Sequence, residues 1–113
     1  MNFSLDYIDE VTQNDSVSRK EIIQLFIDNL PEYLDELELS FEEKDLEVLK
    51  KSAHKLKTPL FTLKAFSIIN QLEFIELEVN QSTPHKLVEN IVKELVFEIK
   101  SLINQLKSQI TIN

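Results

Sequence analysis

The sequence predicts an all-α fold, an antiparallel four-helix bundle with a short additional N-terminal helix. Apolar residues recur at spacings of three and four along four segments, short polar stretches separate these segments, and glycine is absent from all 113 residues. The spacing is typical of amphipathic helices, and short connections favour antiparallel neighbours. Tight β-hairpins usually need glycine at positive φ, so they are disfavoured. We expect residues 1–113 to form a single domain, with the bundle core at about residues 18–110.

The first part of the chain is expected to hold the short helix and one long helix. The short helix is marked by Leu5, Ile8 and Val11, and the polar loop "TQNDS" follows it. Ser18 with Glu21 matches a capping box for the long helix, and Ser16 is a second candidate start. Pro31 lies inside this helix, where it should kink the helix or leave it locally irregular. The apolar stripe of the long helix consists of Ile22, Phe26, Leu30, Tyr33 or Leu34, Leu37 and Phe41.

Three further helices complete the predicted bundle. Asp45 is a suitable N-cap for the next one, whose apolar stripe is Leu46, Leu49, Ala53, Leu56, Leu60 and Leu63. A third helix over about residues 65–79 should turn inward Phe66, Ile69, Leu72, Ile75 and Val79. After the loop "NQST", Thr83 should cap the last helix and Pro84 should be its first residue. The apolar face of the last helix consists of Val88, Ile91 or Val92, Leu95, Ile99, Leu102 and Leu106.

Composition excludes several classes of function. Without glycine the chain has no glycine-rich phosphate loop or dinucleotide fingerprint, and without cysteine it has no disulfide, thiol nucleophile or thiolate metal site. A net charge of −8 argues against nucleic acid or an anionic membrane as the main partner. The start "MNFSLDYIDEV" does not look like a signal peptide, and no apolar run approaches the roughly 20 residues that span a bilayer. We therefore expect a soluble, cytoplasmic monomer.

One segment departs from this acidic average and contains a histidine. Residues 44–64 hold six lysines against two acidic residues, a local balance of +4. His54 lies at the edge of the buried stripe of its helix, and its face is shared by Lys50, Lys51, Lys57, Thr58 and Phe61. Nearby lysines disfavour imidazolium, which keeps the ring nucleophilic, and they stabilise a dianionic group attached to it. This setting suits acceptance of a phosphoryl group, although an incidental surface histidine has the same spacing.

Other candidate sites have less support. His85 lies in the first turn of the last helix and is expected to be an ordinary surface residue. Adjacent carboxylates such as Glu42 and Glu43 show no metal-ligand spacing with a histidine. No Ser-His-Asp or HExxH arrangement is present, so the sequence predicts neither a metal site nor a bound cofactor.

The segment "AHKLKTPLFTLKAFSIINQLEFIE" resembles the signature of histidine-phosphotransfer (HPt) domains, approximately A-H-x-L-K-G followed by small residues. Ala53, His54, Leu56 and Lys57 match this motif. The preceding run "EIIQLFIDNLPEYLDELELSFEEKDLEVLKKSAHKLK" is also similar to the family, including its mid-helix proline, so the resemblance extends from roughly residue 18 onward. The start at Met1 is expected of a standalone protein, and a domain excised from a larger sensor is the alternative.

The resemblance implies a phosphorelay role in two-component signalling. His54 would accept phosphate through Nε2 from an aspartyl-phosphate of a response-regulator receiver domain and pass it to another receiver aspartate. Lys57 would stabilise the phosphoryl oxygens, and Glu76 would accept a hydrogen bond from Nδ1–H. The family has no kinase activity or metal of its own, because the receiver brings Mg²⁺. A hybrid sensor histidine kinase is a further partner that the resemblance allows.

The sequence departs from the family just after the histidine. Thr58 and Lys64 stand where the family has glycine, Phe61 adds bulk nearby, and Pro59 should bend the helix. Partners are expected to dock beside His54, on Phe61, Leu60 or other exposed apolar residues within a rim of lysines. The predicted docking residues are Lys50, Lys51, Thr58, Phe61 and Lys64. The departures keep two alternatives open: an HPt-like interaction module that binds a receiver or kinase without phosphotransfer, and an unrelated helical adaptor in which His54 is idle.

Overall fold

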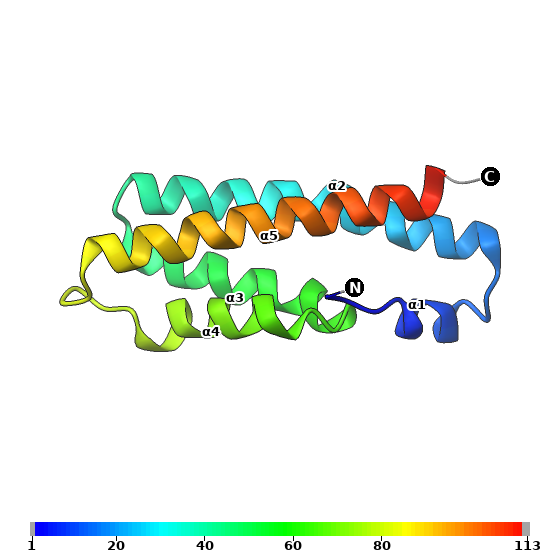
Figure 1. Ribbon diagram of the computed structural model, residues 1–113, viewed down its shortest axis with the longest axis horizontal. Coiled ribbons are helices and arrows are strands. Elements are labelled where there is room, and N and C mark those ends of the chain that lie inside the picture. The colour runs from blue at the N-terminus through cyan, green and yellow to red at the C-terminus, as the bar shows by residue number, and fades with distance from the viewer. Residues whose placement is uncertain (1, 112–113) are drawn as a thin grey trace.

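A computed structural model describes residues 2–111, and every regular element in this range is a helix (Figure 1). The helices are α1 (Asp6–Val11), α2 (Ser16–Glu42), α3 (Leu46–Thr62), α4 (Phe66–Glu78) and α5 (His85–Thr111). The all-α prediction is therefore confirmed, including the short N-terminal helix and the four longer helices that follow it.

The four longer helices form an antiparallel bundle, and the described chain is elongated, with extents of 49 × 21 × 20 Å. Helix α2 packs against α3 and α5, and α4 packs against α3 and α5, so sequence neighbours are also neighbours in space. Helices α2 and α5 have 27 residues each, whereas α3 has 17 and α4 has 13. The long pair consequently extends past the short pair at one end, and α1 lies there against α2 (Figure 1).

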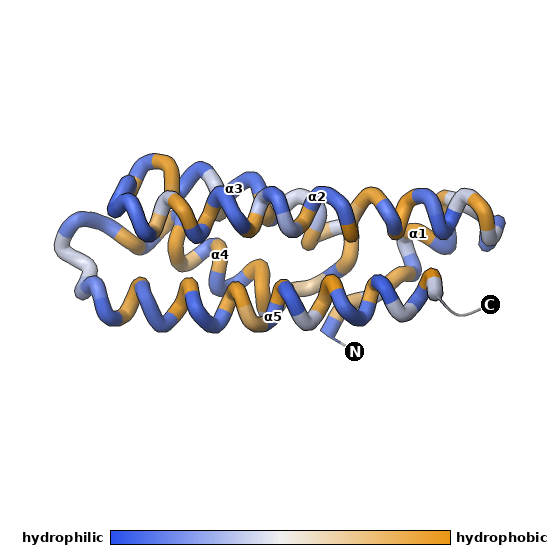
Figure 2. The backbone as a smooth tube through the Cα atoms, turned by 90° about the horizontal axis from the view of Figure 1, so that it is seen from above, coloured by the Kyte–Doolittle hydropathy of each residue, from blue (hydrophilic) through white to orange (hydrophobic). Residues whose placement is uncertain are grey.

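Apolar stripes from all the helices meet in one buried cluster, and Figure 2 shows apolar and polar segments alternating along each helix. The fully buried side chains of α2, α3, α4 and α5 include Leu30, Leu56, Leu72 and Leu95. The stripe predicted for the third helix is confirmed at Ile69, Leu72, Ile75 and Val79, all of which are buried. The prediction is wrong for Phe66, which is 57% exposed because it begins α4 at the edge of the bundle.

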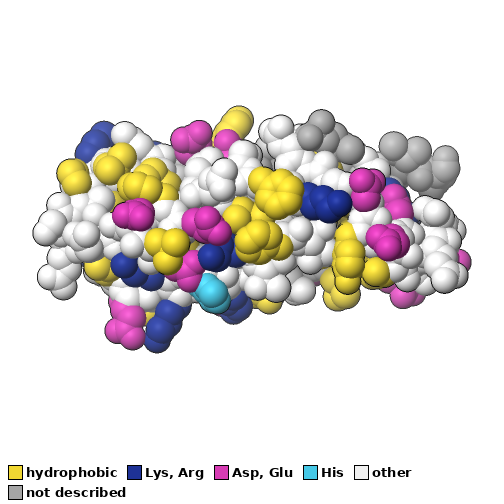
Figure 3. Space-filling model, turned by 90° about the horizontal axis from the view of Figure 1, so that it is seen from below, with side chains coloured by type: hydrophobic (Ala, Val, Ile, Leu, Met, Phe, Trp, Pro, Cys, Tyr) yellow, Lys and Arg dark blue, Asp and Glu magenta, His cyan; other side chains and the backbone are white. Residues whose placement is uncertain are grey.

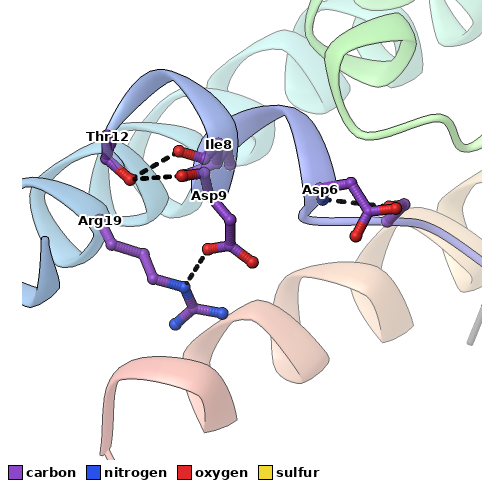
Figure 4. Close-up of polar contacts among 6 residues, drawn as sticks. Asp6, Ile8, Asp9, Thr12 and Arg19 are labelled. Atoms are coloured by element: carbon purple, nitrogen blue, oxygen red, sulfur yellow. Dashed lines mark hydrogen bonds and ion pairs between the residues drawn. The ribbon is translucent and has the colours of Figure 1, made fainter. Parts of the chain in front are cut away.

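The N-terminal segment is part of this packing. The cluster includes Phe3, Leu5 and Ile8, and the Ser4 N–H donates to the Leu63 carbonyl at 2.6 Å, just after α3 ends. Helix α1 is fixed to α2 by an ion pair between Asp9 and Arg19 at 2.6 Å (Figure 4). The end of the histidine-bearing helix is thus braced by residues far away in the sequence.

Two acidic residues cap the helices that precede and carry the histidine. The Asp15 side chain accepts a hydrogen bond from Ser18 N–H, so the N-cap of α2 is Asp15 and helix residues begin at Ser16. The predicted capping box at Ser18 is therefore wrong, and the second candidate start was correct. Asp45 caps α3 as predicted, through a 3.2 Å hydrogen bond from Val48 N–H.

Lysine occupies the left-handed position after two helices. Lys44 and Lys64 have φ values of 57° and 53° and follow the ends of α2 and α3. In both cases the chain closes with the paired backbone hydrogen bonds of a Schellman motif, in which glycine is the usual residue. Lys64 stands at one of the two positions where the HPt signature has glycine, and here the chain retains the turn without it.

The loop before α5 differs from the prediction. The Thr83 hydroxyl accepts a hydrogen bond from Asn80 N–H on the loop side, so it does not cap α5. Pro84 immediately precedes the helix, and its carbonyl accepts from Leu87 and Val88 N–H. Both α2 and α3 run without interruption through their internal prolines, Pro31 and Pro59. Within residues 2–111, no helix is long and apolar enough to cross a membrane.

Candidate functional site

His54 lies in the middle of α3 on a half-turn that faces outward. Ala53 before it and Leu56 after it are both fully buried and anchor the helix to the core. The side chain of His54 itself is 69% exposed. The face of the bundle in Figure 3 shows a histidine bordered by basic and acidic side chains, with hydrophobic side chains nearby. The backbone of His54 is therefore held in place by buried neighbours, while its imidazole is accessible to a partner.

Glu76 holds one side of this ring. Its Oε2 is the hydrogen-bond partner of His54 Nδ1, although the two residues are 22 positions apart and belong to α4 and α3. A carboxylate only accepts, so a neutral imidazole in this contact carries its proton on Nδ1. Its Nε2 then bears the free lone pair, as a nucleophile requires.

Lys57 is bound to the other oxygen of the same carboxylate. Its Nζ lies 2.5 Å from Glu76 Oε1 and 3.9 Å from Glu73 Oε1. From its place on the same helix face as His54, Lys57 is expected to be exposed; its side chain is only 14% exposed, so that expectation is wrong. Helix α4 covers it because α3 and α4 pack closely, and this packing places both acidic residues beside it.

The electrostatics of the cluster keep Glu76 ionised. The hydrogen bond from Lys57 is the main reason that the pKa of Glu76 falls below its ordinary value of 4.5. The hydrogen bond from His54 lowers this pKa further, whereas partial burial opposes the shift. At neutral pH the carboxylate is therefore a constant acceptor for Nδ1–H and a constant partner for the ammonium group.

Two further lysines of the basic segment are also paired with acidic residues. Lys51 pairs with Glu47 at 3.1 Å, and Lys55 pairs with Glu36 at 3.3 Å while lying over the Tyr33 ring. Glu47 is already counted in the balance of +4, but Glu36, Glu73 and Glu76 are not, so the surroundings of His54 are less positive than that balance suggests. The reason is that the acidic residues on α2 and α4 enter the site only through folding.

Comparison with protein families matches residues 21–109 to the Hpt domain. The chain belongs to the Hpt domain family. Members of this family are phosphocarrier modules of two-component signalling that interact with response-regulator receiver domains and with kinases. Comparison with curated proteins and with solved structures finds no significant match.

In this Hpt domain, four of the five predicted docking residues have exposed side chains. Thr58, Phe61 and Lys64 line up along the end of α3 beyond the histidine, with Phe61 49% exposed, and Lys51 lies one turn before it. Lys50 is half-buried. Leu60, also expected among the exposed apolar residues, is fully buried, so that expectation is wrong.

Two of the surface hollows lie along α3 and around His85. The first, of about 520 Å³, lies between α2 and the part of α3 that follows His54, and it is lined by residues that include Leu25, Tyr33, Lys55, Thr58 and Pro59. The second, of about 270 Å³, lies at the far end of the bundle, where the exposed His85 ring stacks on Phe41. His85 is therefore on the surface, as predicted, although it is packed against an aromatic ring.

Sequence reasoning missed Glu73. Its position one helical turn before Glu76 on α4 was the available signal, because residues three apart on a helix share a face. Among residues 2–111, no group of three or more His, Asp or Glu side chains is arranged to hold a metal ion.

Proposed function

We propose that this Hpt domain is a phosphorelay protein that carries a phosphoryl group on His54 between the aspartates of two receiver domains. The observation that carries the proposal is the exposed imidazole whose Nδ1 is bound to Glu76, which leaves Nε2 as the open nitrogen. Membership in the family supports the reaction class. The chain is a carrier in this proposal and has no kinase activity of its own.

The transfer is a single displacement at phosphorus. The lone pair of Nε2 attacks the aspartyl-phosphate of the receiver, the P–O bond breaks, and its electrons leave on the aspartate carboxylate. A P–N bond forms, the Nδ1 proton stays on the ring, and Glu76 accepts its hydrogen bond throughout. The reverse displacement, by the aspartate of a second receiver, regenerates neutral His54.

Lys57 is linked to the reacting ring through Glu76, and we assign it to stabilise the phosphoryl oxygens. It does so while still paired to a carboxylate, so its contribution is smaller than that of a free ammonium group. The receiver is expected to bring Mg²⁺, which supplies most of the charge stabilisation during transfer.

Docking is proposed along α3 on both sides of the histidine. The hollow between α2 and α3 offers the apolar surface of Leu25 and Pro59, and exposed Phe61 offers an aromatic anchor. Lys51 and Lys64, both exposed, form part of a charged rim that would favour an acidic partner surface. A response-regulator receiver fits this surface, and a hybrid sensor kinase is a second partner through its own receiver domain.

The direct test is phosphotransfer from a phosphorylated receiver to the purified protein. We expect a label that is labile in acid and stable in base, as a P–N bond is. His54→Gln should abolish the label, and His85→Gln is the matched control that should retain it, since His85 lies at the far end of the bundle. A label that persists in His54→Gln, or its absence with every cognate receiver tested, contradicts the proposal.

One observation favours a second candidate function, binding without transfer. Thr58, which stands where the HPt signature has glycine, and Phe61 nearby both place exposed side chains just beyond the histidine. If these side chains block the approach of a receiver aspartate, the protein will bind a receiver with the same affinity in wild-type and His54→Gln forms and form no label.

A further inference from the structure

Glu73 is the residue of the site that the proposed mechanism does not use. It lies on α4, its side chain is 42% exposed, and its Oε1 is 3.9 Å from Lys57 Nζ. No hydrogen bond joins it to His54 within the described residues, in contrast to Glu76. Any effect of Glu73 on the imidazole must therefore pass through Lys57 or through space.

The role of Glu73 follows from the charges of the three side chains Lys57, Glu73 and Glu76. Lys57 contributes one positive charge, whereas Glu73 and Glu76 contribute two negative charges, so the cluster beneath His54 is net negative. A phosphoryl group on a side chain adds up to about two more negative charges. To stabilise that group, Lys57 has to divide its attraction between the phosphoryl oxygens and two carboxylates.

We propose that Glu73 is a positioning residue that competes with the phosphoryl group for Lys57 and so keeps phosphohistidine at a high transfer potential. The inference rests on the proposed function. It adds a reason for the phosphoryl group to move from His54 to a receiver aspartate. Phosphohistidine at His54 is then less stable, and transfer of its phosphoryl group to a receiver aspartate is favoured. Glu76 has a different role, because it also holds the imidazole and cannot be removed without disturbing the nucleophile.

The equilibrium can be measured without a receiver by using phosphoramidate as the donor. Nε2 displaces ammonia from phosphorus, so one P–N bond breaks and another forms, and the displaced ammonia takes up a proton from solvent. At a fixed ratio of phosphoramidate to ammonium, the fraction of phosphohistidine seen by ³¹P NMR reports the equilibrium constant. This separates the intrinsic property of the site from docking.

Glu73→Gln should raise this equilibrium constant about two- to fivefold, the range expected for a partly exposed charge interaction. The gain should shrink as salt is raised, because screening weakens the competition. Glu78→Gln is the matched control, since Glu78 is an exposed acid on the same helix with no ion pair in the described residues, and it should leave the constant unchanged.

A double-mutant cycle tests the route through Lys57. In a Lys57→Gln background the gain from Glu73→Gln should disappear, whereas simple repulsion by Glu73 would leave it intact and overturn the inference. An unchanged constant in Glu73→Gln overturns it as well. If the wild type takes phosphoryl from phosphoramidate but from no receiver, the proposed function fails and the Glu73 test still stands. If it takes none from either, both fail.

Discussion

Glu76 accepts the Nδ1–H of His54 through one carboxylate oxygen and pairs with Lys57 through the other. The three side chains come from two helices that meet only in the folded bundle. The Glu76 carboxylate links the orientation of the imidazole to the charge of Lys57. A substitution at any of the three residues should therefore alter the interactions of the other two.

Removing the Glu76 carboxylate should leave the His54 imidazole without its fixed orientation. Glu76→Ala is expected to slow phosphorylation of His54 by phosphoramidate about ten- to hundredfold, because a hydrogen bond to a charged group is worth about 1.5–3 kcal/mol. Long-range ¹H–¹⁵N NMR should show His54 losing its preference for the proton on Nδ1. Glu78→Ala on the same helix is the control, and equal rates in both variants would contradict the assigned role.

Acid should weaken the fold through the same carboxylate. The pKa of Glu76 is lowered in the folded state, chiefly by Lys57, so its stabilising contribution is complete above the ordinary value of 4.5. That contribution is lost as the pH falls through the lower, folded value. Thermal melts between pH 6 and pH 3 should therefore show a smaller loss of Tm in Glu76→Gln than in the wild type. Parallel curves of Tm against pH for the two proteins would show that the Glu76–Lys57 pair does not contribute to stability.

Lys57 should matter for stability as well as for transfer, since its side chain is mostly covered. Lys57→Ala leaves Glu76 without its main partner, which should cost about 1–3 kcal/mol of unfolding free energy in urea. Lys51→Ala removes an exposed pair with Glu47 and should stay within about 0.5 kcal/mol of the wild type. Equal losses in the two variants would mean that the covered position of Lys57 has no energetic consequence.

The left-handed lysines offer a way to stabilise the protein. Lys44→Gly and Lys64→Gly should each raise the unfolding free energy by about 1 kcal/mol, because a residue with a Cβ pays that much or more at positive φ. Lys50→Gly, inside α3, should lower it by about 1 kcal/mol. Urea denaturation distinguishes these cases, and a loss of stability in both loop variants would contradict the strain argument.

The sequence was sufficient for the fold because burial follows the apolar stripes. Residues such as Leu30, Leu56 and Leu95 lie at helical spacing in the sequence and are fully buried in the bundle. Local competition was harder to predict. Asp15 and Ser18 are both good N-caps, and only the backbone conformation before α2 selects Asp15.

The sequence predicts those features of the site that depend on α3 alone. The spacing on α3 placed Lys57 near His54, but burial of Lys57 depends on α4, which the sequence of α3 does not describe. The family resemblance supplied Glu76 as a partner for the imidazole. Glu73 was missed because its effect depends on a side-chain distance that exists only after α3 and α4 have packed.

The central claim, that Nε2 of His54 is the nitrogen that carries the phosphoryl group, has a direct test. The protein is labelled by a phosphorylated receiver and the phosphohistidine is examined by ³¹P and ¹⁵N NMR in the intact chain. We predict one phosphoryl group, bonded to Nε2 of His54, with the proton retained on Nδ1. A phosphoryl group on Nδ1, on His85, or on neither histidine would contradict the account.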